Sequence, residues 1–194
     1  IGSGSSSLLG LSASFFILDR LWHNSGIVST TTTAQAITTP TWPARDKNGS
    51  TNGEGVYVAL EMSAAPTNGA ITNTTLDYTN SAGVSGRTGA LGSVASGSNA
   101  GCFYIFQLQA GDTGVRSIQG ITLGTSYVGL NSLHLVAFRP IIDYPFLYHP
   151  QISNLDPVGL GFPRCYDNTV PFVTTLCSSA SATSGIFTLQ FAHG

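Results

Sequence analysis

The chain has 194 residues, a size that suits one domain with a core of its own. Only 8% of its residues are Asp, Glu, Lys or Arg, against about 25% in an ordinary soluble domain, and the net charge is −2. The seven basic residues are scattered, which excludes a basic nucleic-acid footprint and a Lys/Arg-rich membrane-surface helix. No stretch approaches the roughly 18 unbroken apolar residues of a membrane span. So few charges indicate a protein that packs against other protein.

Residues 1–36 are predicted to be an N-terminal arm and the segment that leads into the domain. Gly2–Ser7 (GSGSSS) favours a flexible arm, and it lacks the basic region and the cleavage site of a signal peptide. Phe15–His23 (FFILDRLWH) suits a short helix or an extra strand. The uncharged, β-branched run Thr30–Pro40 is predicted to be an edge strand of its own domain; the alternative is a strand that adds to another chain's sheet.

Residues 37–194 are predicted to form a single β-sandwich domain. The clearest strand is Val56–Met62, where side chains alternate between two faces. One face would carry Val56, Val58, Leu60 and Met62, and the other would carry Tyr57, Ala59 and Glu61. Thr72–Tyr78 is a second strand, with Thr74, Leu76 and Tyr78 on one face. Thr79–Gly89 is rich in turn residues and predicts a loop or an irregular edge.

Three further segments have the β pattern. Cys102–Gln109 is nearly continuous apolar sequence, which predicts a central strand covered on both faces. Val115–Leu123 resumes the alternation after a turn. Leu133–Ile142 is a strong strand that we expect to end at Pro140, because proline cannot donate a ladder hydrogen bond.

A long loop rich in proline and aromatic residues is predicted at about residues 143–171, and loops of that length are usually functional. Val170–Cys177 and Ile186–Ala192 would then close the domain as two strands. The sequence therefore predicts an all-β fold, an antiparallel β-sandwich of jelly-roll or Greek-key type, with an N-terminal arm and this long loop.

No motif for chemistry stands out. The histidines, at positions 23, 134, 149 and 193, have no metal-ligand spacing, and His134 is expected to be a satisfied core or interface residue. Asp46, Asn48, Ser50 and Asn52 alternate like the ligands of a calcium loop, but Thr51 and Tyr57 stand where that loop needs Gly and Glu. A polar turn before a strand explains this run better. Buried free thiols are expected at Cys102, Cys165 and Cys177, because none has a paired spacing.

Catalysis is also not indicated. No Ser lies in a nucleophile elbow, and the GLGFP run at Gly159–Pro163 lacks the Lys of a phosphate loop. Glu61 and Asp77 fall on outward strand faces, where surface charge is the simpler interpretation. We therefore expect no catalytic residues, no bound metal and no cofactor.

Five segments together resemble one family. They are Asp19–Ile37 (DRLWHNSGIVSTTTTAQAI), Gly53–Ala65 (GEGVYVALEMSAA), Tyr78–Gly89 (YTNSAGVSGRTG), Phe103–Leu123 (FYIFQLQAGDTGVRSIQGITL) and Gly161–Phe172 (GFPRCYDNTVPF). They are similar to virion structural proteins of tailed double-stranded DNA bacteriophages, in head-associated or capsid decoration roles.

The resemblance implies a non-enzymatic decoration or cement subunit on the outside of an assembled capsid. Its partners would be the major capsid protein and copies of itself, as a homotrimer, without nucleic acid or membrane. Its location would be the virion, assembled in the bacterial host cytoplasm. The alternatives are a tail-tube or connector component, and a tail fibre or spike that binds receptors or glycans. In the glycan-binding alternative, Trp22, Trp42, Tyr144 and Tyr148 would stack on sugar rings.

Overall fold

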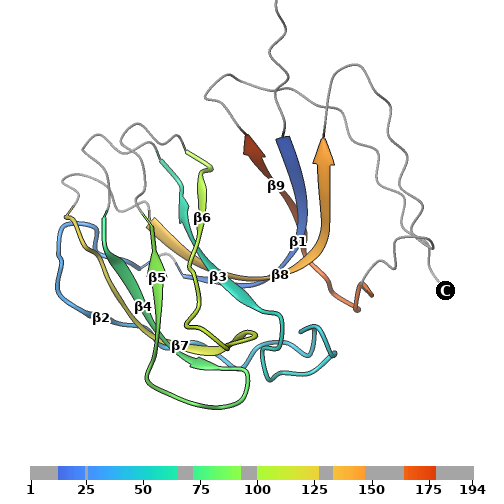
Figure 1. Ribbon diagram of the computed structural model, residues 1–194, viewed down its shortest axis with the longest axis horizontal. Coiled ribbons are helices and arrows are strands. Elements are labelled where there is room, and N and C mark those ends of the chain that lie inside the picture. Colours follow the sequence, from blue (N-terminus) through green and yellow to red (C-terminus); the bar gives the residue numbers. More distant parts are fainter. Residues whose placement is uncertain are drawn as a thin grey trace, which may run out of the picture.

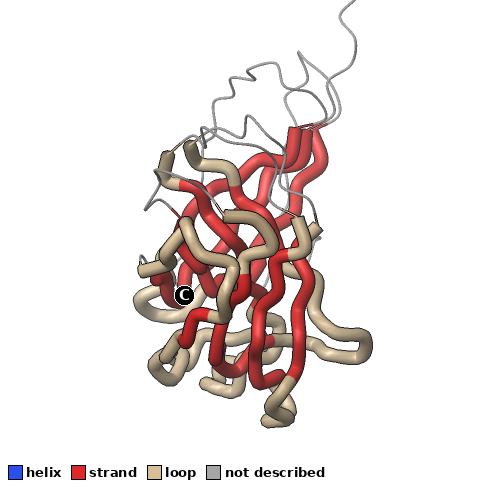
Figure 2. Tube along the Cα trace, turned by 90° about the vertical axis from the view of Figure 1, so that its left-hand side faces the viewer, coloured by secondary structure: helices blue, strands red, loops and turns tan. Residues whose placement is uncertain are grey.

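The computed structural model describes residues 13–24, 26–64, 72–92, 100–126, 133–146 and 164–177. These residues form nine β-strands and no helix (Figures 1 and 2). The strands are β1 (Ala13–Asn24), β2 (Gln35–Ala36), β3 (Tyr57–Met62), β4 (Thr74–Asn80), β5 (Arg87–Leu91), β6 (Phe103–Ile105), β7 (Val115–Thr122), β8 (Leu133–Phe146) and β9 (Pro171–Cys177). The described part of the chain therefore contains no helix with the length and apolar character that a membrane crossing requires.

The first eight strands pair like one long hairpin that has been folded over. β1 pairs with β8, β2 with β7, β3 with β6 and β4 with β5, and all four pairs are antiparallel. The folded hairpin makes two sheets, ordered β6-β3-β8-β1-β9 and β2-β7-β4-β5. This is the jelly-roll arrangement, with β9 added beside β1. The predicted all-β, antiparallel sandwich-type fold is confirmed, and β1 and β8 curve strongly along their length (Figure 1).

The core between the two sheets follows the predicted alternation. Val58, Leu60 and Met62 of β3 are fully buried, and they pack in one cluster with Leu76 and Tyr78 of β4. Burying these side chains is the main favourable contribution to folding, at about 25 cal/mol per Å² of apolar surface. The two best-patterned segments of the sequence thus supply facing walls of the core.

The N-terminal boundary differs from the predicted one. Residues 13–24, assigned from sequence to the segment before the domain, form β1, which lies inside the five-stranded sheet between β8 and β9. Phe15–His23 is therefore strand, not helix. Two register shifts, between Ile17 and Leu18 and between Arg20 and Trp22, accompany the curvature of this strand. Residues 1–12 lie outside the described part of the chain.

The prediction of a central strand at Cys102–Gln109 is wrong. Only Phe103–Ile105 is strand, at the edge of its sheet, and the side chain of Ile105 is 52% exposed. The chain then crosses to the other sheet: Phe106 N donates to Val58 O of β3, and Gln107 exchanges two backbone hydrogen bonds with Ala90 of β5. The apolar run reflects this change of sheet and not a strand covered on both sides.

Proline does not end β8. The strand continues through Pro140 to Phe146, because the register with β1 shifts at this point, where Ile17 pairs with Ile142 and Leu18 with Pro140. The pairing with β3 has ended by then, at Phe138. At Pro140 there is therefore no pairing with β3, and the ladder with β1 is irregular. Proline is tolerated at such a position, although it has no N–H to donate.

The other predictions near the C-terminus have mixed outcomes. Residues 143–146 of the expected loop belong to β8, residues 164–170 are turn and irregular backbone, and residues 147–163 lie outside the described residues. β9 matches the predicted strand at Val170–Cys177, whereas the strand predicted at Ile186–Ala192 lies outside the described part. Thr30–Pro40 contains the short edge strand β2 of its own domain, as expected.

Candidate functional site

The five-stranded sheet carries a cluster of aromatic rings on the face that points away from the sandwich core. Phe138 of β8 is buried there with Leu18, Ala59 and Val136, and four half-buried rings pack over them. These four are Phe16, Tyr57, Phe103 and Phe172. We call this surface, formed by these four residues with Phe138 and the exposed Ile105, the aromatic face.

Ring contacts join strands that are far apart in the sequence. Phe103 lies 5.1 Å from Phe138 and 5.7 Å from Phe172 between ring centroids, both in edge-to-face geometry. Tyr57 lies 6.2 Å from Phe138. Edge-to-face pairs of this kind add about 0.5–1.5 kcal/mol to the burial of the rings themselves. The aromatic face is thus an ordered surface.

One ion pair lies among these rings. Arg20 of β1 donates from Nη2 to Glu61 Oε1 of β3 at 2.8 Å, and each side chain is about one-quarter exposed, at 26% and 25%. The Arg20 guanidinium also lies over the Phe172 ring, 4.8 Å from its centroid. Glu61 is directly opposite Phe103 in the β3–β6 ladder. The aromatic face therefore includes an ion pair that lies next to the rings of Phe103 and Phe172.

Part of this surface could be predicted from the sequence. Alternation in Val56–Met62 correctly placed Tyr57, Ala59 and Glu61 away from the core, and it identified Glu61 as an outward charge. The contributions of Phe103 and Phe172 were missed, because only the strand register shows that β6 and β9 bring rings to the same face. A signal was available in β3 itself, where Tyr57 and Ala59 give the outer face an apolar character.

A second group of charges is buried where residues 164–170 cover the sheet. Asp19 is fully buried and accepts hydrogen bonds from Arg45 Nε at 3.1 Å and from Val170 N at 2.9 Å. Arg139 Nη2 lies 3.8 Å from the same carboxylate, and its guanidinium stacks on Tyr166 at 5.2 Å. This group fastens the segment before β9 to β1 and β8.

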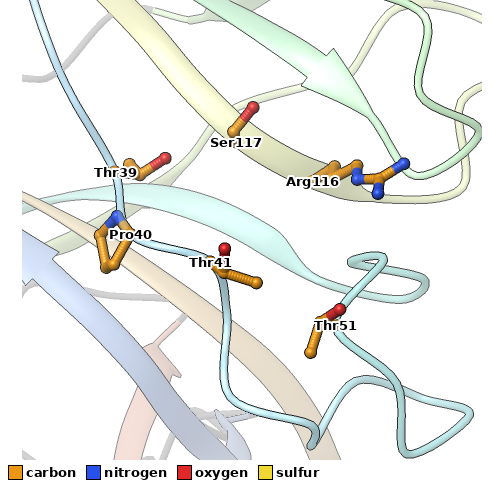
Figure 3. A pocket seen from close by; sticks show the side chains of 6 residues that line it. All are labelled: Thr39, Pro40, Thr41, Thr51, Arg116 and Ser117. Atoms are coloured by element: carbon orange, nitrogen blue, oxygen red, sulfur yellow. The ribbon is translucent and has the colours of Figure 1, made fainter.

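A polar cleft of about 210 Å³ lies at the other sheet, between β7 and two loop segments (Figure 3). Its lining consists of Thr39, Pro40, Thr41, Thr51, Arg116 and Ser117. The lining offers hydroxyl groups and one guanidinium. Among the described residues, this lining includes no carboxylate, imidazole or thiol, the groups that usually act as general base or metal ligand.

The residues considered from sequence for metal binding have structural roles. The carboxylate of Asp46 is buried and accepts hydrogen bonds from the backbone N–H groups of Asn48, Ser50, Gly53 and Glu54 and from the Ser50 hydroxyl. Burial alone would raise the pKa of Asp46, but these hydrogen bonds outweigh it and lower the pKa below 3.8. The polar-turn interpretation of this run is confirmed. Within the described ranges, no group of three or more His, Cys, Asp or Glu residues is placed to hold a metal ion.

The histidine and cysteine predictions are met in part. His134 shares the outer sheet face with Val136, and its Nε2 lies 2.9 Å from Ser63 Oγ, although its buried Nδ1 has no hydrogen-bond partner. His149 and His193 lie outside the described residues. Cys102 is a free thiol that is partly buried against the core, so the prediction of burial is met only in part there. Cys165 is free but exposed, so the prediction of burial is wrong at that position.

The two tryptophans considered for sugar stacking pack against the sandwich core. Trp42 is 1% exposed and donates its Nε1–H to the carbonyl of Val115 at 2.7 Å. Trp22 packs against the same core, 5.9 Å from Trp42 between ring centroids. Trp42 is thus a core residue, whereas Trp22 is partly buried beside it. No protein-family model, curated protein or solved structure matches the chain.

Proposed function

We propose that this chain is a non-enzymatic structural protein of a phage virion, which binds the outer surface of the assembled capsid as a decoration or cement subunit. Its partners are the major capsid protein and copies of itself. It acts in the virion, which is assembled in the bacterial host cytoplasm. The jelly roll is compatible with this role but does not select it, because capsid proteins, lectins and cupins share that architecture.

The aromatic face carries the proposal. Phe, Tyr and Arg are enriched in the buried centres of protein–protein interfaces, and in this chain they gather on one sheet face with an ion pair between them. Surface charge keeps proteins soluble and separate, and only 8% of the residues of this chain are charged. The chain therefore has few charges to keep an exposed aromatic face from associating with other protein. The phage resemblance of the five sequence segments then suggests which kind of assembly the face serves.

A subunit that binds only the assembled shell stabilises it by mass action. The gain is RT ln(1 + [L]/Kd), about 2.7 kcal/mol for each site at a free concentration 100 times the Kd. Repetition of the contact over the shell makes even a modest affinity effective. No chemical step is needed for this role.

The copy number of the chain in purified particles tests the proposal. Quantitative mass spectrometry against the major capsid protein should give a number comparable to that of the shell protein. Particles that lack the chain should lose their DNA at a lower temperature than complete particles and, on dilution of salt, at a higher salt concentration. A copy number of only a few per particle would reject the decoration role and favour the tail-fibre, spike or connector alternative.

A further inference from the structure

We propose that the aromatic face is the contact surface for a second copy of this chain, in a twofold arrangement with Arg20 of each copy paired to Glu61 of the other. The inference rests on the assembly role proposed above and deepens it by naming the surface and the partner. Its basis is the position of the Arg20–Glu61 ion pair among the rings of the aromatic face.

The ion pair restricts which partner can cover this face. Any protein that buries the rings must also take water from Arg20 and Glu61, which are each about one-quarter exposed. Removing water from an ion pair is costly unless the partner supplies hydrogen bonds to the remaining donors and acceptors. Within the described part of the chain, the guanidinium of Arg20 and the carboxylate of Glu61 make one hydrogen bond, the one between Nη2 and Oε1. Their other donors and acceptors are left for a partner to satisfy. A purely apolar partner surface would therefore bind poorly.

A second copy satisfies this requirement. A twofold contact brings the same patch to itself, so that residue i meets residue j and residue j meets residue i. The cation of one copy then faces the anion of the other. The two ion pairs together form a closed network of four charged side chains that alternate in sign. Phe103, Phe172 and the 52% exposed Ile105 lie on the same face and would supply the apolar contact around that ring.

Such a contact joins two chains. It differs from the homotrimer that the resemblance implies, because a threefold ring needs two different surfaces on each chain. We therefore expect the isolated protein to associate as a pair through the aromatic face.

Charge reversal tests this arrangement. Arg20→Glu puts two anions on the face, and Glu61→Arg puts two cations there. Each variant alone should show a dissociation constant raised about 100-fold or more in sedimentation equilibrium, because like charges meet across the twofold contact. An equimolar mixture of the two variants should associate again, to within about tenfold of the native value. This recovery depends on opposite faces meeting, so it does not follow from a loss of folding in either variant.

Matched controls use charges on the other sheet. Asp77→Arg and Arg116→Glu reverse exposed charges of β4 and β7 and should leave the association unchanged. Ile105→Glu adds a charge at an exposed position of the aromatic face and should weaken association without loss of thermal stability. A native protein that stays a single chain at high concentration, a trimer that the reversals leave intact, or a mixture that does not recover would each overturn the proposal.

The two proposals fail separately. Pairing of the isolated chain with no copies in the particle would remove the capsid role and leave the aromatic-face contact. Abundant copies in the particle with no recovery in the mixture would remove this contact alone.

Discussion

The carboxylate of Asp19 accepts the backbone N–H of Val170 at 2.9 Å, across 151 positions of sequence. The same carboxylate accepts from Arg45 Nε, and the guanidinium of Arg139 lies 3.8 Å away. One buried anion therefore holds the beginning of β9 and two buried cations against β1.

Replacing Asp19 should be among the most destabilising single changes in the chain. Asp19→Ala leaves Arg45 and Arg139 buried without their anion, and we expect a loss of about 3–5 kcal/mol of unfolding free energy. Asp19→Asn keeps an acceptor for Val170 but removes the charge, so its loss should be intermediate. Urea unfolding of the three proteins measures both values. Equal stability of the Asn variant and the native protein would contradict a role for the charge.

Acid should weaken a second network, around Asp112. Hydrogen bonds from Arg87 lower the pKa of Asp112 from 3.8 to about 2, and Tyr78 and Asn80 also donate to this carboxylate. Because the folded pKa is the lower one, the stabilisation is complete above pH about 4 and is lost as the pH falls towards 2.

Asp112→Asn should therefore lower the Tm by several degrees at neutral pH and by less at pH 2. Thermal melts across this pH range, with the exposed Asp77→Asn as control, give the measurement. A difference between Asp112→Asn and the native protein that does not shrink on acidification would refute this interpretation of the network.

Gly53 should not tolerate a side chain. Its φ is +84°, and a Cβ built on it would lie 2.0 Å from the carbonyl oxygen of Val115, the same oxygen that accepts from Trp42. We expect Gly53→Ala to cost about 3 kcal/mol or more, because backbone would have to move. Gly86 is a matched control, since it has φ +70° but open space around it, and Gly86→Ala should cost only about 1 kcal/mol. Similar losses for both variants would mean that φ, and not the contact, sets the cost.

Chelation should have no effect on stability. The Asp46 carboxylate accepts four backbone N–H groups and one hydroxyl, so it has no need of a cation. We expect the same Tm in EDTA and in millimolar Ca²⁺, whereas Asp46→Ala should lower the Tm clearly in both. A rise in Tm with Ca²⁺ that Asp46→Ala abolishes would instead reveal a cation site in this turn.

The sequence predicted what depends on local pattern. Strict alternation identified β3 and the inward face of β4, and β-branched polar sequence identified the edge strand β2. It failed where long-range pairing decides. The apolar residues of Cys102–Gln109 are covered because the chain changes sheet there, and Pro140 continues a strand because a register shift accommodates it.

The aromatic face lies between these two cases. The outward direction of Tyr57 and Glu61 follows from the alternation in β3. The rings that join them come from β6, β8 and β9, and their meeting depends on the order of strands in the sheet. Composition had nevertheless indicated a protein made for contact with other protein.

The pairing of Ala13 with Cys177 has a mechanical consequence. β1 and β9 are antiparallel, so the chain enters the first strand and leaves the last at the same corner of the sheet. A pull between these two points loads the seven residue pairs of this ladder one after another, like a zipper, instead of shearing them together. If the flanking residues were tethered to separate bodies, β9 would peel away first at low force, while the jelly roll of β1 to β8 stayed folded.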